Sequence, residues 1–210
     1  MSVEDRRPLV AVPPPQRPLR TRRAARVVVR AAGRVLLLAD TDPGLPGSGW
    51  WVTPGGGLDT GEDFRAAAVR ELLEETGLQV AASDLVGPLA RRVVRHGYSD
   101  QVLVQAEEFF ALDLPAVFEP DTTGFTAEER ATIAGARWFR LDELGGITVW
   151  PAQLAGLLDA AGQPGPVDWG DMEESTVPVR LGHRGCDRVP PPARLGAAGD
   201  PASAATRGNG

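Results

Sequence analysis

Residues 55–78 read GGGLDTGEDFRAAAVRELLEETGL, and this stretch decides the fold. Three glycines precede a run of helix-forming residues from 63 to 76, and the run ends at Gly77, a residue type that often closes helices. Ala68 and Leu72 lie four positions apart, at the spacing of neighbours on one helix face. The stretch therefore predicts a glycine loop followed by an amphipathic helix that packs on a core.

Three glutamates, Glu71, Glu74 and Glu75, occupy this helix three and four residues apart. Residues at that spacing share one helix face, so we expect the three carboxylates to converge on one patch. Like charges there repel by about 0.2–0.5 kcal/mol per pair, and the C-terminal end of a helix already carries partial negative charge. A divalent cation removes both penalties, and Mg²⁺ is typically held by one or two carboxylates together with substrate phosphates. The pattern favours half of a metal site, completed by a phosphorylated ligand, over a solvated acidic face.

Charged residues and glycines around the helix fit the same site. Arg70 precedes Glu74 by four positions, so we expect it to pair with that carboxylate and fix its orientation. Glu62 and Asp63 lie at the helix start, where the helix dipole favours negative charge. The glycines at 55–57 allow backbone conformations closed to other residues, and we expect them to bring carbonyl groups close to an ion.

The spacing of these residues resembles the Nudix box of the Nudix hydrolase (MutT-like) family. Every fixed position of that motif is filled by Gly56, five residues, Glu62, seven residues, and then Arg70-Glu71-Leu72-Leu73-Glu74-Glu75-Thr76-Gly77-Leu78. The resemblance implies an α/β fold, the Nudix α/β/α sandwich with a mixed β-sheet. It also implies hydrolysis of a nucleoside diphosphate linked to another moiety, with Mg²⁺ or Mn²⁺ as the cofactor.

The same resemblance assigns roles to individual residues. Metal contacts are implied for the Gly55 carbonyl, Glu71, Glu74 and Glu75. A catalytic part is implied for Glu74 and for Arg70 as its orienting partner, and motif support for Gly56, Glu62 and Gly77. In the implied reaction water attacks a phosphorus of a pyrophosphate bridge, while metal ions polarise the phosphate oxygens and lower the pKa of that water.

Outside the motif, β-branched and aliphatic runs alternate with loop residues. Gly33 separates the runs 26–30 and 35–39, which predicts a hairpin. A Pro/Gly-rich loop is expected at 41–49, further strands at 50–53, 89–96, 102–112 and 136–141, and a closing helix at 151–161. This order predicts a mixed sheet with few helices.

Proline and glycine content divides the chain into a core and two ends. About one residue in three is Gly or Pro between 162 and 210, against about one in six between 21 and 161. Such a composition buries too little apolar surface to offset the entropy of ordering. We therefore expect a flexible Pro/Arg-rich arm at 1–20, one domain at 21–161, and a disordered Gly/Pro/Ala-rich tail at 162–210.

The base that activates the water lies outside the motif, and residue parity offers one candidate. On the predicted strand 102–112, Glu108 falls on the apolar face, where a carboxylate needs a partner or an ion. Glu107 points to the other face and is expected to be solvated. Alternatively Glu108 is structural, or a bulge shifts the register. The acidic residues near the long loop are weaker candidates: Glu119, Asp121, Glu128 and Glu129.

Substrate contacts are less well indicated than metal contacts. Trp51 and its neighbour Trp50 offer a stacking face for a base, with core or rim packing as the alternative. Arg91, Arg92 and Arg95 are candidates for phosphate contacts, or they decorate a strand edge. Tyr98, with His96 beside it near a turn, is a candidate for lining a cleft, or it faces water.

Overall composition restricts the class of protein. The chain has 42% hydrophobic and 24% charged residues, as a soluble globular protein does, and its net charge of −6 argues against a nucleic-acid partner. No apolar run approaches the length of a membrane span, and the N-terminus shows no secretory signal, so we expect a cytoplasmic protein without a membrane partner. The single cysteine, Cys186, excludes an internal disulfide.

The resemblance also orders the candidate partners. A nucleotide-type small molecule is expected as substrate, with nucleoside triphosphates (oxidised ones included) first and ADP-ribose or nucleotide sugars next. Family members are often dimers, so a homodimer is a further expectation. The alternative is a Nudix-fold sensor that binds a nucleotide or a partner without cleaving it, but such proteins often have a degenerate motif, whereas this motif is intact.

Overall fold

The computed structural model describes residues 7–159 and 165–179 of the 210-residue chain. Its strands are β1 (Leu19–Ala31), β2 (Arg34–Asp40), β3 (Trp50–Val52), β4 (Val86–Gly97), β5 (Val102–Leu114), β6 (Ile133–Arg140), β7 (Val149–Trp150) and β8 (Val167–Glu173). Its α-helices are α1 (Phe64–Thr76), α2 (Glu129–Thr132) and α3 (Leu154–Asp159). Short 3₁₀ turns are η2 (Pro14–Gln16), η3 (Ala82–Asp84) and η4 (Leu141–Gly146).

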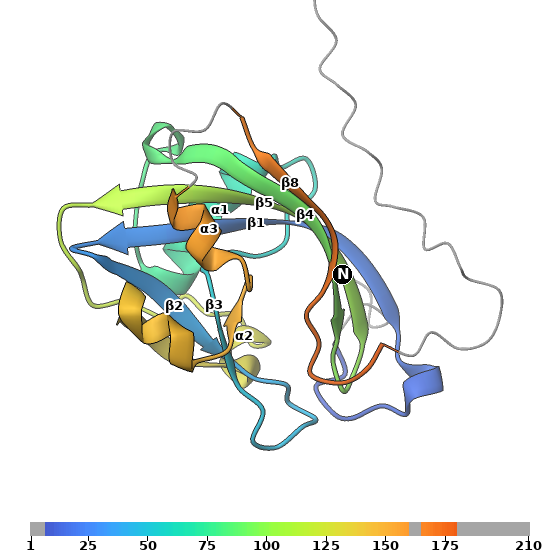
Figure 1. Cartoon of the computed structure of the whole chain (residues 1–210). Coiled ribbons are helices and arrows are strands. Elements are labelled where there is room, and N and C mark those ends of the chain that lie inside the picture. The colour runs from blue at the N-terminus through green and yellow to red at the C-terminus, as the bar shows by residue number, and fades with distance from the viewer. Residues whose placement is uncertain (1–6, 160–164, 180–210) are drawn as a thin grey trace, which may run out of the picture.

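The strands in the described part of the chain form one mixed, curled sheet (Figure 1). Its order is β7-β3-β2-β1-β5-β4-β8, and β6 pairs with β2. The central pair, β1 and β5, is parallel along the whole of β1, whereas β4 and β5 form an antiparallel pair. On the other side β1 meets β2 only near their shared turn, at Arg30 and Ala31. The rest of that edge of β1 is therefore open to the glycine loop that precedes α1.

Helix α1 is set by signals at both of its ends. Asp63 is the N-cap, and its Oδ1 accepts a hydrogen bond of 2.8 Å from the Ala66 N–H. Gly77 ends the helix with φ of 71°, and its N–H donates to the Leu73 carbonyl. The expected helix at 63–76 is confirmed within one residue.

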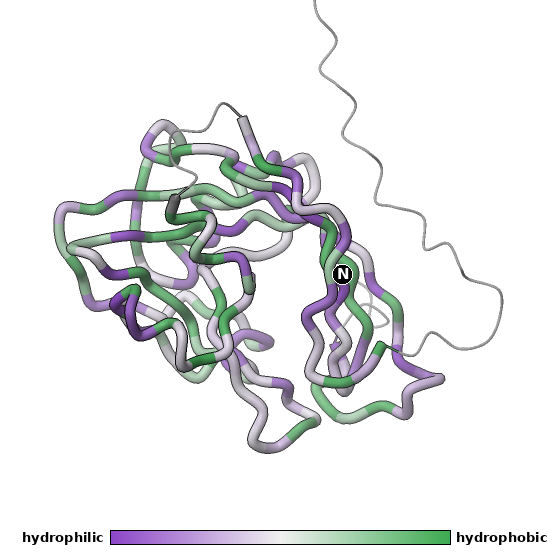
Figure 2. The backbone as a smooth tube through the Cα atoms, viewed as in Figure 1, coloured by the Kyte–Doolittle hydropathy of each residue, from purple (hydrophilic) through white to green (hydrophobic). Residues whose placement is uncertain are grey.

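Two hydrophobic clusters pack on opposite faces of the sheet. Ala25, Val27 and Val29 of β1 pack with the apolar side of α1, whereas Val28 packs with Leu157 of α3. Consecutive residues of a strand point to opposite faces, so the unbroken apolar run Val27–Val29 is buried on both sides, while other parts of the chain mix hydrophobic and hydrophilic residues (Figure 2). The α/β class with a mixed sheet is confirmed. No helix among residues 7–159 and 165–179 has the length and apolar character needed to cross a membrane.

The two ends contain more structure than their proline and glycine content suggests. Within the expected arm, the Arg7 side chain is paired with Asp100, and the Val12 N–H donates to the Ser99 carbonyl at 2.9 Å. Within the expected tail, β8 runs parallel to β4. Contacts with distant parts of the chain stabilise these residues, and amino-acid composition does not predict such contacts. Residues 1–6 of the arm, 162–164 and 180–210 of the tail, and the last two residues of the expected domain, 160–161, lie outside the described residues.

Candidate metal centre

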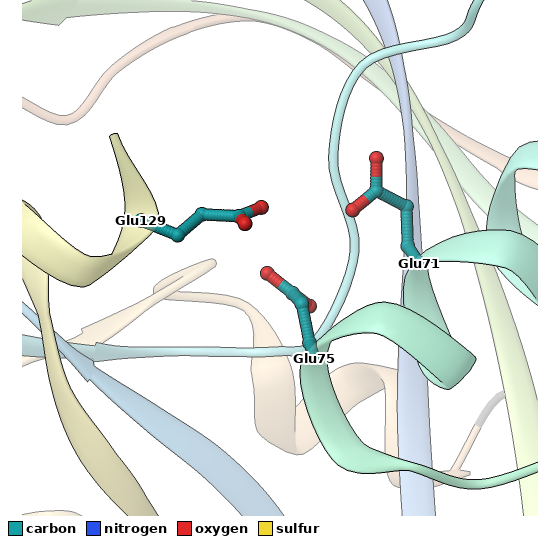
Figure 3. A group of neighbouring side chains, drawn as sticks. All are labelled: Glu71, Glu75 and Glu129. Atoms are coloured by element: carbon teal, nitrogen blue, oxygen red, sulfur yellow. The ribbon is translucent and has the colours of Figure 1, made fainter. Parts of the chain in front are cut away.

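Three carboxylates from two helices point toward one another (Figure 3). Glu71 and Glu75 come from α1 and Glu129 from α2, and one oxygen of each lies within 4.8 Å of the others. Glu71 and Glu75 are buried and Glu129 is half-buried. We call these three residues the glutamate group. Its geometry suits a hard divalent cation, which takes oxygen ligands.

Glu129 reaches the group because the preceding loop packs on the end of α1. The Asp121 N–H donates to the Thr76 carbonyl at 3.0 Å, which ties the loop to the helix. Thr126 and Glu129 then form a capping box: the Thr126 N–H donates to Glu129 Oε2 at 2.6 Å, and the Glu129 N–H donates to Thr126 Oγ1 at 3.3 Å. The Thr-x-x-Glu spacing was visible in the sequence as a helix start. It gave no sign that the carboxylate meets Glu71 and Glu75, so the sequence named Glu129 only as a weaker candidate for the base and not as a member of this group.

The glycine loop provides the floor of the glutamate group. The Gly55 N–H donates to Glu75 Oε2 at 2.6 Å, which satisfies one oxygen of that buried carboxylate. A Cβ atom at Gly56 would lie 2.6 Å from Glu71 Oε1, and one at Gly55 would collide with the Ala25 carbonyl. Both positions therefore require glycine, because any side chain would displace a glutamate or β1. The Gly55 carbonyl itself accepts a hydrogen bond from Arg26 Nη1 at 2.5 Å, and its contact with a metal stays a prediction.

Arg70 connects the glutamate group to the glycine loop. One of its contacts, the pair with Glu74, was expected from the sequence. Its Nη1 donates to Glu74 Oε2 at 3.0 Å, the expected pair, and to Glu71 Oε1 at 2.9 Å. Its Nε and Nη2 bind both oxygens of Glu62, and Nη2 also donates to the Gly57 carbonyl at 2.7 Å. A two-point guanidinium–carboxylate contact fixes orientation as well as distance. Arg70 thereby holds Glu71 against the loop.

Glu74 lies outside the glutamate group, unlike the expected convergence of Glu71, Glu74 and Glu75. Its side chain is 37% exposed and faces Arg70. The reason is helix geometry. Residues four apart differ by about 40° around the helix axis, so Glu71 and Glu75 align. Adjacent residues differ by about 100°, so Glu74 points in a different direction from Glu75. A metal contact from Glu74 therefore remains a prediction without a supporting contact.

The electrostatics of the glutamate group favour a bound cation. Burial raises the pKa of Glu71 to about 7, against the opposing charge of Arg70. Burial and then the charge of Glu71 raise the pKa of Glu75 well above its usual value. Both shifts mean that ionised carboxylates are unfavourable here without a counter-charge. The donor set and its charge thus fit Mg²⁺ or Mn²⁺.

A chain of buried ion pairs lies beside this site and corrects the expectation that Glu107 is solvated. Glu107 is 2% exposed and sits between Arg26 (3.1 Å) and Arg92 (2.6 Å). Burial opposes its ionisation, but the charges of Arg92 and Arg26 outweigh burial and lower its pKa to about 2. Arg92 also binds Glu174 at 2.8 Å. Both faces of β5 are covered, so alternation alone could not identify a solvent side.

Glu108, the candidate base, is buried but lies apart from the glutamate group. Its Oε1 is 2.9 Å from Arg91 Nε, and it is not among the described acidic residues that gather with Glu71 and Glu75. Burial raises its pKa, while Arg91 opposes the shift. The structure supplies the partner that a carboxylate on an apolar face needs, and the role of base stays a prediction.

The candidate substrate contacts are of two kinds, packed aromatic side chains and arginines of β4. Trp51 packs edge-on against Phe139, with ring centroids 4.5 Å apart, and Tyr98 is buried in a stack with Trp50. Arg91 is engaged by Glu108, and the main chain of Arg95 pairs with β8. Among the described residues, none of the four touches the glutamate group, so each remains a prediction.

Comparison with known proteins identifies a family and a shared fold. The family model described as NUDIX domain matches residues 20–159. An uncharacterised Nudix hydrolase of Bacillus subtilis is 38% identical over 65 residues (31% of this chain, 38% of the relative), and an RNA pyrophosphohydrolase of Dinoroseobacter shibae is 51% identical over 49 residues (23% and 29%). The matched stretch thus spans about a third of these curated relatives. The crystal structure of the MutT protein from Bacillus halodurans has 18% identity and a TM-score of 0.50, covering 74% of this chain and 91% of that one, which shows a shared fold.

Proposed function

The chain belongs to the Nudix family, and from this premise we propose that it hydrolyses a pyrophosphate bond in a nucleoside diphosphate linked to another moiety. The observation that carries the proposal is the glutamate group, whose three oxygens lie within 4.8 Å of one another beside a glycine loop. Nucleoside triphosphates, oxidised ones included, are the first substrate class to test, followed by ADP-ribose and nucleotide sugars. The Dinoroseobacter relative is named for cleaving the same kind of bond.

Each residue of the site has a distinct task in this proposal. Glu71, Glu75 and Glu129 would hold Mg²⁺ or Mn²⁺, which supplies charge stabilisation at phosphate oxygens and a more acidic attacking water. Arg70 keeps Glu71 oriented through their 2.9 Å contact. The Gly55 N–H keeps one oxygen of Glu75 occupied and so directs the other oxygen away from the loop. Glu74 and Glu108 remain predicted contributors, as a further ligand and as the base.

Release of phosphate or pyrophosphate from a nucleotide panel tests the proposal. The purified chain is compared with and without Mg²⁺, and beside the variants Glu71→Gln and Glu119→Gln. Glu119 is an exposed loop residue, so its variant is the matched control for loss of one negative charge. We expect metal-dependent turnover that Glu71→Gln reduces by more than about 100-fold, beyond the loss that outer-shell substitutions cause. Binding of a nucleotide without any turnover by the wild type would contradict hydrolysis and favour a sensor.

A further inference from the structure

The glycine loop runs beside β1 and brings two arginines of that strand close to the glutamate group. The Ala25 N–H donates to the Gly56 carbonyl at 2.9 Å, and the Leu58 N–H donates to the Arg23 carbonyl at 3.0 Å. Residues two apart on a strand share a face, so Arg22 and Arg26 lie on the same face of β1. The loop therefore lies along the strand edge next to both side chains.

Consecutive glycines of the loop touch the glutamate group and Arg22. A Cβ atom at Gly56 would lie 2.6 Å from Glu71 Oε1, and one at Gly57 would lie 3.4 Å from Arg22 Nη1. Neighbouring residues of a chain are about 3.8 Å apart. Adjacent glycines therefore place the Arg22 side chain near the glutamate group, close enough for the charge of Glu71 to act on it.

Arg22 differs from the other arginines around the site in its partners. Arg26, Arg70 and Arg92 each form an ion pair with a glutamate. Among the described residues, no carboxylate lies within 4.0 Å of the Arg22 guanidinium. Arg22 has one hydrogen bond there, from its Nε to Gln105 Oε1 at 2.5 Å. That bond fixes the plane of the guanidinium, and neither Nη group has an acceptor among residues 7–159 and 165–179.

The surroundings of Arg22 also favour an anionic ligand. The residue is exposed on the surface, and Gln105, which orients it, is 1% exposed and therefore fixed in place. The positive charge of Arg26, on the same face of β1, acts on Arg22. A phosphate group beside Arg22 would offset this repulsion, because opposite charge favours the ionised guanidinium.

We propose that Arg22 binds a phosphate group of the substrate, adjacent to the phosphate held at the glutamate group. This inference rests on the proposed function. The planar guanidinium donates two parallel hydrogen bonds to one phosphate, a contact that lysine cannot reproduce. Two neighbouring cationic positions, one supplied by the metal and one by Arg22, match two linked phosphates.

Binding of inorganic pyrophosphate in the presence of Mg²⁺, measured by titration calorimetry, tests the assignment. Arg22→Gln is compared with Arg34→Gln, which removes one positive charge at the start of β2, away from the glycine loop. We expect Arg22→Gln to weaken pyrophosphate binding by about 10-fold to 100-fold, the range for a hydrogen bond to a charged group, and Arg34→Gln to leave it unchanged. Arg22→Lys should recover only part of the loss. Thermal unfolding of each variant checks that the fold is retained.

A second variant separates orientation from charge. Gln105→Leu keeps the positive charge of Arg22 but removes the acceptor that fixes it, so we expect a smaller loss of pyrophosphate affinity than in Arg22→Gln. Kinetics on any hydrolysed nucleotide should show the Arg22→Gln effect mainly in KM.

The outcomes distinguish this inference from the proposed function. Equal pyrophosphate affinity in wild type and Arg22→Gln, or no binding to the wild type, would overturn the role of Arg22 even if nucleotides are hydrolysed. Arg22-dependent binding of pyrophosphate without hydrolysis of any nucleotide would uphold the phosphate site and refute the hydrolase.

Discussion

Burying individual glutamates at this site lowers the stability of the metal-free protein. Glu75 is 4% exposed, and in the described chain it has a backbone N–H but no cation within ion-pair distance. The pKa of Glu75 is raised well above its usual value by burial and by Glu71. A carboxyl whose pKa is raised by folding stabilises the fold below its unfolded pKa and loses that contribution as the pH rises. The metal-free protein therefore carries a penalty at neutral and alkaline pH.

The first prediction follows from that penalty. Glu75→Gln keeps an acceptor for the Gly55 N–H and removes the charge, so we expect it to stabilise the metal-free protein at pH 8 by about 1–3 kcal/mol. The corresponding rise in Tm is about 2–4 °C per kcal/mol for a chain of this size. The gain should vanish near pH 4, where the wild-type carboxyl is protonated. Thermal unfolding in chelator measures it, with Glu119→Gln as the control; a destabilised Glu75→Gln protein at pH 8 contradicts the reasoning.

His96 gives a second prediction, in acid. It is 3% exposed, its Nδ1 lies 2.8 Å from the Glu174 carbonyl and must donate to it, and its Nε2 has no partner among the described residues. Burial lowers its pKa from 6.5 to about 4, although Glu107 opposes the shift. The unfolded chain then binds the extra proton, so stability falls as the pH drops from 6.5 to 4, by up to about 3 kcal/mol.

The control for this second prediction is His96→Asn, which keeps a donor for the Glu174 carbonyl and cannot titrate in that range. Urea unfolding between pH 4 and 7 should give a flatter stability profile for the variant than for the wild type. Parallel profiles would show that His96 is not the titrating group.

At the scale of elements, the sequence predicted well what local chemistry decides. Helix α1 was expected at 63–76 and lies at Phe64–Thr76, because Asp63 and Gly77 act through short-range hydrogen bonds. The solvation of Glu107 was predicted wrongly, because its face of β5 is buried and Arg26 and Arg92 of the neighbouring strands pair with it. Strand β8 was missed because its pairing with β4 joins residues about 80 positions apart in the chain.

The N-cap of α1 supplies the third prediction. Asp63→Ala removes the acceptor for the Ala66 N–H, and we expect a loss of about 1 kcal/mol in the free energy of unfolding. Asp63→Asn retains an acceptor oxygen and should lose much less. Chemical denaturation of the two variants tests the difference, and equal losses would show that the cap contributes nothing specific.

At the scale of the whole molecule, the site assembles from distant segments. Helices α1 and α2 supply the glutamate group, the glycine loop contacts it through the Gly55 N–H, and Glu129 lies more than fifty positions beyond Glu75. The motif revealed Glu71, Glu75 and Arg70 because they share one helix. Glu129 and Arg22 were not revealed, because only the packing of the loop and β1 around α1 brings them close.

The buried ion-pair chain gives the fourth prediction at this scale. Glu174 joins Arg92 of β4 to the Ala152 N–H near α3, with both hydrogen bonds at 2.8 Å. Glu174→Ala leaves buried donors unpaired, so we expect a loss of about 2–4 kcal/mol in stability. Glu173→Ala, an exposed neighbour, should change stability by less than about 0.5 kcal/mol. Denaturation midpoints compare the two, and a tolerated Glu174→Ala would mean that the C-terminal residues 165–179 do not stabilise the domain.

The most direct test of the account is a titration of the metal-free chain with Mn²⁺, followed by electron paramagnetic resonance. Binding should weaken at least about tenfold in each of Glu71→Gln, Glu75→Gln and Glu129→Gln, and remain unchanged in Glu119→Gln. Wild-type protein that binds no Mn²⁺, or Glu129→Gln protein that binds it as tightly as the wild type, would contradict a metal centre built from these three glutamates.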